Sequence, residues 1–291
     1  MTEIKLTQRA LRAWAGTDRL SALQPERLAR LPITMASTEL ALFVAGVDVP
    51  ILDPADDDMF CERRGELTHA RVALLPTAHG IVICDRHDAR VDDPLRVCWP
   101  DDSSYHLARA IPPGRRAGWL DVGCGSGFAV LERPQLADAC IGVDVNPRAV
   151  TLAKLGAMIS HARLLPRHAD ATTFDAGEMF ELVTCNPPIP DCDGPIWRGA
   201  SAEIVRAMIA TAGKHVAPGG LAVVHAALEL LRELPGDVVT VAYTPEDARA
   251  FGIAWWQPDG EARQIVAHRA LSTDRPHIDW TDRDAALAGA L

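Results

Sequence analysis

The sequence predicts an α/β fold with a doubly wound, mainly parallel sheet, and three observations predict it. Short apolar runs recur from residue 119 onward, and the first two contain or end in an aspartate. A turn with a glycine at every second position follows the first run. Segments with helical spacing of apolar residues separate later runs. Strands that alternate with helices favour parallel pairing. We therefore expect seven mainly parallel strands, preceded in the sequence by an N-terminal extension of helices and a β-hairpin.

The segment 119–131 is expected to form the first strand, a tight turn and the start of a helix. The apolar run contains Asp121 and leads directly into Gly123, Gly125 and Gly127. Glycine lets the backbone bend sharply and lets a ligand lie against bare main chain. The free N–H groups at the start of the helix would face such a ligand. A plain turn is the alternative that this spacing alone leaves open.

The second strand strengthens the case for a ligand site. Cys140–Asp144 is apolar and ends in an acid, 17 residues beyond Gly127. A carboxylate at this place in a doubly wound sheet can accept both hydroxyls of a ribose. Asn146-Pro147 then begins a helix that runs to about residue 160.

The third strand is expected at 162–165, and Asp170 and Ala171 follow it. The carboxylate of Asp170 can accept the amino group of an adenine, and Ala171 can flank the ring; an ordinary loop is the alternative. The last four strands are expected at 180–185, 221–226, 237–243 and 263–268. Trp255-Trp256 falls between the last two of these strands; packing is the expected role, and one ring in the core with the other in a surface or partner contact is the alternative.

The fourth strand leads into Asn186-Pro187-Pro188-Ile189. In a doubly wound sheet this corner would lie beside the glycine turn, because ligands bind at the carboxyl ends of the strands. Two prolines stiffen the chain after Asn186. The side-chain oxygen of Asn186 and the carbonyl of Pro187 can then accept hydrogen bonds from the same amino group. They would orient its nitrogen lone pair for the in-line transfer of a group to that nitrogen.

Residues 1–94 are expected to form a helical cap and a β-hairpin, the hairpin from the apolar runs 71–75 and 80–84. This portion can serve as a substrate lid or as a stabilising appendage. A helix capped by Asp101 to Ser103 follows and ends at 112–114. Its start is expected at the mouth of the site, where Tyr105 would contact the substrate.

Composition narrows the class of protein. The chain of 291 residues has a net charge of −10 and no clustered basic arm, which disfavours nucleic acid as a substrate. Its seven cysteines contain no Cys-x-x-Cys pair, so reduced thiols and no metal site are expected. Residues 1–30 carry charges throughout, and no apolar stretch is long enough for a bilayer. A cytoplasmic protein with no membrane partner is therefore expected, and no feature sets an oligomeric state.

These motifs resemble the class I S-adenosylmethionine (AdoMet) methyltransferases, whose fold is Rossmann-like. Asn-Pro-Pro followed by an aromatic residue is typical of the small-domain group of that family, which includes release-factor glutamine and ribosomal RNA guanine N2-methyltransferases. The resemblance covers 95–225 and implies a methyltransferase domain over 95–291. It implies AdoMet as cofactor and Asn186 and Pro187 as catalytic residues. The implied cofactor-binding residues are Asp121, Gly123, Cys124, Gly125, Gly127, Asp144, Val145, Asp170, Ala171 and Asn186.

One position departs from the family pattern. The residue after the two prolines is Ile189, which cannot stack on a planar base as an aromatic ring does. Trp197 is a candidate replacement for the ring, and loop packing is its alternative role. The acidic loop Asp191–Gly194 favours a cationic substrate and disfavours a phosphate. Together these features favour a small-molecule amine or amide, with Tyr105, Ile189 and Trp197 as substrate contacts. A protein glutamine, an RNA base, a cyclising reaction on AdoMet and a partner-binding module remain alternatives.

Overall fold

A computed structural model describes residues 42–44, 46–50, 60–77, 79–195, 197–245, 249–289 and 291. The helices expected before residue 41 lie outside these described residues. Within them, every helix is too short or too polar to cross a lipid bilayer.

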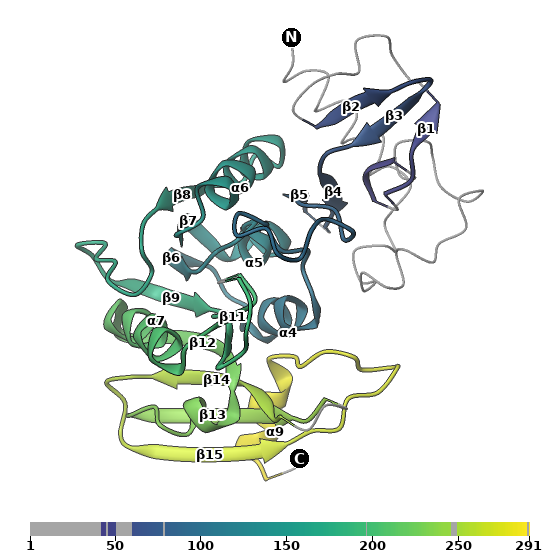
Figure 1. The fold of residues 1–291 in the computed structure, drawn as a ribbon. Coiled ribbons are helices and arrows are strands. Elements are labelled where there is room, and N and C mark those ends of the chain that lie inside the picture. Colours follow the sequence, from purple (N-terminus) through teal and green to yellow (C-terminus); the bar gives the residue numbers. More distant parts are fainter. Residues whose placement is uncertain are drawn as a thin grey trace.

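The core of the molecule is one eight-stranded sheet with the strand order β15-β13-β14-β12-β9-β6-β7-β8 (Figure 1). All neighbouring pairs are parallel except those of β14, which is antiparallel to both β12 and β13. The strands of this sheet are β6 (Arg116–Val122), β7 (Ala137–Asp144), β8 (Leu164–His168), β9 (Phe180–Cys185), β12 (Val216–Ala227), β13 (Asp237–Tyr243), β14 (Phe251–Gln257) and β15 (Arg263–His268). The predicted Rossmann-like, doubly wound α/β fold is confirmed.

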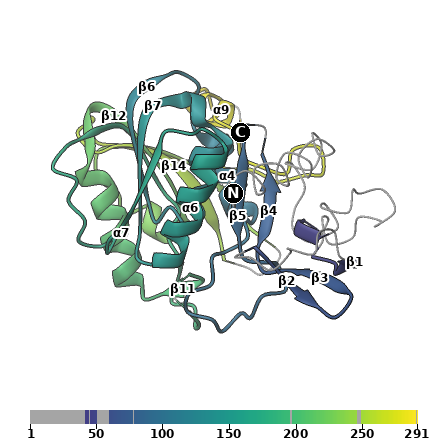
Figure 2. The same cartoon turned by 90° about the horizontal axis from the view of Figure 1, so that it is seen from above.

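Helices cover both faces of the sheet, and Figure 2 shows α7 on one side and α4 and α6 on the other. On one face, α7 (Ala202–Lys214) and α8 (Leu228–Leu231) share a buried apolar cluster with the sheet. The second cluster joins the other face to the remaining helices. These are α4 (Asp102–Ala110), α5 (Phe128–Glu132), α6 (Pro147–Ile159) and α9 (Thr281–Leu287), with the short 3₁₀ turn Pro134–Leu136 after α5.

The sheet has one strand more than the seven predicted, because Phe251–Gln257 forms β14. The packing expected for the two tryptophans is present, since Trp255 and Trp256 are 1% and 4% exposed. They point to opposite faces of one strand, and helices cover both faces, so each ring enters a different apolar cluster. Each indole N–H donates to a backbone carbonyl, of Ala110 and of Pro235.

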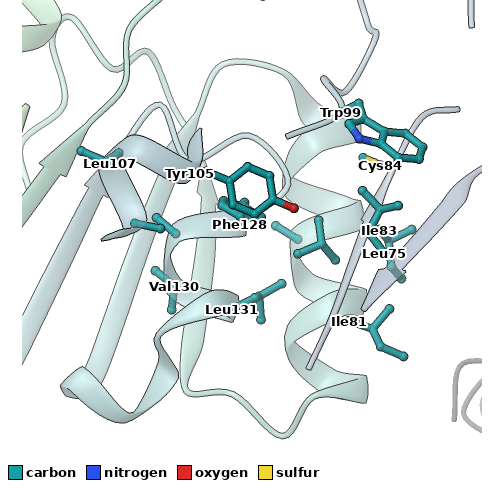
Figure 3. Packing of buried hydrophobic residues seen from close by; sticks show 14 of the residues in the cluster. Leu75, Ile81, Ile83, Cys84, Trp99, Tyr105, Leu107, Phe128, Val130 and Leu131 are labelled. Carbon is teal, nitrogen blue, oxygen red and sulfur yellow. The ribbon is translucent and has the colours of Figure 1, made fainter. Parts of the chain in front are cut away.

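The predicted hairpin is present as β4 (Ala73–Pro76) and β5 (Ile81–Cys84), which pair antiparallel. Figure 3 shows its side chains Leu75, Ile81 and Ile83 on the same apolar cluster as Leu131 of α5. The hairpin is therefore packed into the main core. Smaller strands complete the described structure: β1 (Val49–Pro50), β2 (Cys61–Arg64) and β3 (Leu67–Ala70) form one small sheet, and β10 (Ile189–Pro190) pairs with β11 (Gly199–Ala200).

Candidate functional site

A cavity of about 380 Å³ opens where β6, β7 and β9 end at their carboxyl edge. Its size suits a small-molecule site. Most of the residues predicted for the site line this cavity. They are Asp121, Gly123, Cys124, Gly125, Asp144, Val145, Asp170, Ala171, Asn186, Pro187, Ile189 and Trp197.

The glycine turn forms one wall of the cavity. Gly123, Gly125 and Gly127 have φ values of 74°, 53° and 76°, in the left-handed region that favours glycine. A Cβ at Gly125 would meet no atom within 4 Å, so open space adjoins its main chain. Gly127 has a different role, because it precedes α5 and a Cβ there would lie 2.8 Å from Leu164. Gly127 therefore supports packing and does not line the cavity.

Asp121 lies in β6 at the floor of the cavity, where it is 4% exposed. Its Oδ1 accepts a hydrogen bond of 2.6 Å from the hydroxyl of Thr184 on the neighbouring strand. Among the described residues nothing donates to Oδ2. Burial, and to a smaller extent the nearby Asp144, raise the pKa of Asp121 to about 6, against the lowering effect of Thr184. The floor thus holds a carboxyl group that lacks a cationic partner.

Asp144 ends β7 and is held in place by two backbone N–H groups. Gly125 donates to its Oδ2 and Asn146 to its Oδ1, each over 2.8 Å. The main effect on its pKa is desolvation, which raises it, and these two hydrogen bonds oppose the shift. Each oxygen keeps a further lone pair for a ligand, so the acid is oriented as a pair of acceptors on the cavity wall.

Asp170 and Ala171 follow β8 and line the next part of the wall. The Oδ1 of Asp170 accepts from both the backbone N–H and the hydroxyl of Thr172, and these bonds lower the pKa of this exposed carboxylate. Its Oδ2 has no donor among the described residues. Ala171 is buried beside it and offers a small apolar surface.

Asn186 and Pro187 come directly after β9 and line the cavity beside the glycine turn, because Cys185 pairs with Val122 of β6. The side-chain amide of Asn186 is held at both ends. Its Nδ2 donates to Ser103 Oγ over 2.9 Å, and its Oδ1 lies 3.0 Å from His225 Nδ1. The amide is therefore fixed at the cavity wall.

The outer part of the cavity combines apolar and cationic side chains. Ile189 is 38% exposed there, and the indole of Trp197 donates to the carbonyl of Asp93 over 3.1 Å. The guanidinium of Arg96 lies 4.9 Å from the centre of the Trp197 ring. The acids of the 191–194 loop are absent from the lining, whereas Arg198 is part of it, so the cationic preference expected from that loop has no support here.

Tyr105 does not line the cavity, in contrast to its prediction as a substrate contact. Helix α4 presents Ser103, Ser104 and Leu107 to the cavity and turns Tyr105 toward the core. There the ring packs edge-on against Phe128 at 4.8 Å, and Figure 3 shows the two side by side. The prediction failed because helical periodicity does not tell which face of a short helix meets the ligand.

Three residues at the site were not predicted from the sequence: Thr184, His225 and Tyr243. Each is a polar residue within a buried stretch of its strand. That pattern is the signal that the sequence offered, because buried polar side chains need partners. His225 and Tyr243 lie behind Asn186 and outside the cavity lining. Across the described part of the chain, no group of His, Cys, Asp or Glu side chains is arranged to hold a metal ion.

The cavity offers several hydrogen-bond acceptors to a ligand along one edge of the sheet. An uncompensated acid lies at its floor, an oriented carboxylate and bare main chain lie beside it, and Asp170 and Ala171 come next along the same edge. The oriented amide of Asn186 lines the same cavity.

Comparison with known proteins gives one family match. The model of the family described as "Methyltransferase small domain" matches residues 99–244, half of the chain. A ribosomal protein L11 methyltransferase from Burkholderia ambifaria is 37% identical over 81 residues, which are 28% of this chain and 25% of that protein. A ubiquinone biosynthesis O-methyltransferase from Stutzerimonas stutzeri is 28% identical over 130 residues, 44% of this chain and 48% of that one. The chain thus spans half or less of the length of these curated relatives.

Among solved structures, the N-methyltransferase NodS from Bradyrhizobium japonicum in complex with S-adenosyl-L-homocysteine is similar with a TM-score of 0.41 and 18% identity. The similarity covers 54% of this chain and 86% of that one. At this level it says nothing of what this chain acts on.

Proposed function

Because the chain belongs to the methyltransferase small domain family and is an AdoMet-dependent methyltransferase, we propose that it transfers the methyl group to an amino or amide nitrogen, most readily of a small molecule. The family and the cofactor predicted from the sequence are confirmed by the family match. The nitrogen acceptor and its size are the proposal. The observation that carries it is the Asn186-Pro187-Pro188 corner, whose fixed amide lines the cavity beside the glycine turn.

The residues that would hold AdoMet follow from the donors and acceptors of the cavity wall. Asp121 offers its free Oδ2 to the ammonium group at the floor, where a cation would relieve the buried charge. Asp144 offers one acceptor from each oxygen to the ribose hydroxyls. Asp170 and Ala171 would receive the adenine, and the open space beside Gly125 admits the ligand against main chain.

The acceptor would be held at the Asn186-Pro187 corner. AdoMet supplies the methyl group on its sulfonium sulfur. Asn186 Oδ1 and the carbonyl oxygen of Pro187 would accept hydrogen bonds from the two N–H groups of an amine. This arrangement would direct the nitrogen lone pair away from the two oxygens. The same two oxygens would stabilise the positive charge that develops on the nitrogen during the transfer. No strong base is needed near the nitrogen, because its proton can leave afterwards to water.

The outer cavity supports a small acceptor. Ile189 gives an apolar contact where the family has a stacking ring, and Trp197 provides an indole at the same rim. The net charge of −10 and the absence of a basic arm disfavour a nucleic acid. One named relative is a ribosomal protein L11 methyltransferase and the other a ubiquinone biosynthesis O-methyltransferase, so a protein is the second candidate acceptor.

The test is incubation of the protein with methyl-labelled AdoMet and a cell extract, followed by separation of small molecules, protein and RNA. We expect label in the small-molecule fraction and release of S-adenosylhomocysteine. Label in protein or RNA would reject the small-molecule part of the proposal. Methylthioadenosine without label transfer would reject methylation itself and favour a cyclising reaction, and AdoMet binding without turnover would favour a binding module.

Asn186→Ala tests the assigned nitrogen-binding corner. It should leave the AdoMet dissociation constant nearly unchanged and remove most label transfer, since the amide faces the acceptor. Gln135→Ala is a matched control, because it removes an exposed amide outside the cavity lining and should behave as wild type. Equal loss of binding and of transfer in Asn186→Ala would contradict the assigned role.

A further inference from the structure

Asn186 lies at the centre of a series of five hydrogen-bonded side chains that runs across several strands of the sheet. Ser103 donates to Asp101 Oδ1 over 2.6 Å and lies 2.9 Å from Asn186 Nδ2. On the other side, Asn186 Oδ1 is 3.0 Å from His225 Nδ1, and His225 Nε2 is 2.9 Å from the hydroxyl of Tyr243. The five side chains come from the start of α4 and from the ends of β9, β12 and β13.

The direction in which hydrogen atoms are donated along these five side chains is set by Asp101. A carboxylate accepts hydrogen bonds and does not donate them, so the single hydroxyl hydrogen of Ser103 is used on Asp101. Ser103 Oγ can then only accept from Asn186, which places Nδ2 toward Ser103 and Oδ1 toward His225. The orientation of the amide is therefore specified by chemistry and not only by packing.

The same reasoning fixes the proton of His225. Because Asn186 Oδ1 is an acceptor, the imidazole must carry its hydrogen on Nδ1. The ring is 5% exposed, and this desolvation lowers the pKa of His225 to about 4, against a raising effect of Asp101. The neutral ring has one N–H, so Nε2 is an acceptor and the hydroxyl of Tyr243 donates to it.

The surroundings of His225 keep it in this state. Its ring stacks on Phe251 at 5.7 Å with an interplanar angle of 3°, and the ring of His106 lies 6.3 Å away. Burial lowers the pKa of His106 to about 2, so His106 is neutral as well. Tyr243 is buried, and its own pKa is raised by desolvation, so it keeps the hydrogen that it donates.

We propose that His225 and Tyr243 are positioning residues that hold the Asn186 amide with its oxygen available to the methyl acceptor. This inference rests on the proposed role of Asn186. One lone pair of Oδ1 is used by His225, and the second is left for an N–H of the acceptor. A rotated amide would instead present its NH₂ group, which cannot accept from an amine. Neither His225 nor Tyr243 lines the described cavity, so both act through Asn186.

The first test is a long-range ¹H–¹⁵N nuclear magnetic resonance spectrum of the histidine rings in the whole protein, and it needs no acceptor. His225, assigned by the signal missing from His225→Asn, should show its hydrogen on Nδ1 and remain neutral at pH 6. In Tyr243→Phe the donor to Nε2 is lost, but the hydrogen should stay on Nδ1, because Asn186 Oδ1 still accepts from it. A wild-type ring with its hydrogen on Nε2 would overturn the inference.

The second test compares three variants in the label-transfer assay, with extract varied to separate the maximal rate from the apparent KM. His225→Leu removes the donor and should lower the maximal rate by about tenfold, the scale of one lost hydrogen bond. His225→Asn places an amide N–H where Nδ1–H stands and should restore most of that loss. Tyr243→Phe should fall between them. AdoMet affinity, measured by calorimetry, should stay within about twofold of wild type in all three, as expected for residues outside the cavity lining.

The outcomes separate this inference from the proposed function. If Asn186→Ala transfers label as wild type does, the proposed function fails. If Asn186→Ala is inactive while folded His225→Leu and Tyr243→Phe both transfer at the wild-type rate, only the inference fails. If His225→Leu does not fold, Tyr243→Phe and the ring spectrum decide.

Discussion

The hydroxyl of Thr184 donates to the carboxylate of Asp121 over 2.6 Å, between two paired residues of neighbouring strands. The direction is fixed, because the indole N–H of Trp119 donates to the same hydroxyl over 2.7 Å and an indole cannot accept there. Thr184 therefore ties one carboxylate oxygen to the core and leaves the other for the cavity.

This arrangement predicts a pH dependence of cofactor affinity. Burial raises the pKa of Asp121 to about 6, and a carboxylate binds an ammonium group only when it is ionised. AdoMet affinity should be full above that pKa and fall as the pH drops through it, by about tenfold between pH 7 and pH 5. Calorimetric titrations across this range would measure it.

Asp121→Asn is the control for the pH prediction. It should bind AdoMet more weakly than wild type at pH 7 and show a much flatter profile, because the amide does not titrate. A wild-type affinity that does not change between pH 5 and pH 7 would show that Asp121 does not pair with a cation in the complex.

Asp144→Ala should weaken AdoMet binding by about 1.5 to 3 kcal/mol, the range for hydrogen bonds to a charged group. Asp170→Ala removes an exposed acid on the same cavity edge and should cost less, since water competes for that contact. Calorimetry measures both. Because Asp144 also accepts from Gly125 and Asn146, thermal unfolding must be followed alongside. Equal affinity in wild type and Asp144→Ala would rule out the ribose contact.

Gly125→Ala should separate backbone strain from ligand exclusion. Its matched control is Gly177→Ala, because both glycines have positive φ, 53° and 72°, and a Cβ at either meets nothing within 4 Å. Each substitution should cost about 1 to 2 kcal/mol of unfolding free energy from the left-handed backbone. Only Gly125→Ala should also weaken AdoMet binding, since Gly177 lies outside the cavity. Similar AdoMet affinity in the two variants would place the ligand away from the turn.

Asp282→Asn should destabilise the fold without touching the cofactor site. Asp282 pairs with Arg269, and their side chains are 2% and 7% exposed. Removing one charge leaves the other buried, which costs about 3 to 5 kcal/mol. Glu233→Gln removes an exposed pair with Arg206 and should change the unfolding free energy by less than about 1 kcal/mol. Urea unfolding of both variants measures the difference, and a similar small effect in each would refute the assigned cost.

The acidic and glycine-rich part of the cavity lining was predictable because its residues lie in short contiguous segments of the sequence. Asp121 and Gly125 lie in one short segment, and Asp144 ends the next strand, so a local pattern places all three on one edge. Asn186 was predictable for the same reason, since its prolines mark the corner.

The other features depend on what packs across the sheet. Phe251–Gln257 is apolar on both faces, which is the pattern of a strand covered on both sides, but the paired tryptophans obscured it. Tyr105 was misplaced because the orientation of α4 is set by its packing against Phe128. The link from Asn186 to His225 joins residues 39 apart, and only the pairing of β9 with β12 brings them together.

The segment after β15 contributes contacts to α4 that can form only late in the synthesis of the protein. The backbone N–H of Ile278 donates to His106 Nδ1, and that of Trp280 to the carbonyl of Arg109, so late residues are bonded to the helix that begins at the cavity mouth. During synthesis on the ribosome, more than 160 further residues must be added after this helix before its partners Ile278 and Trp280 are made. A chain halted before residue 278 would therefore leave an imidazole and a helix face uncovered, and we expect such intermediates to bind chaperones.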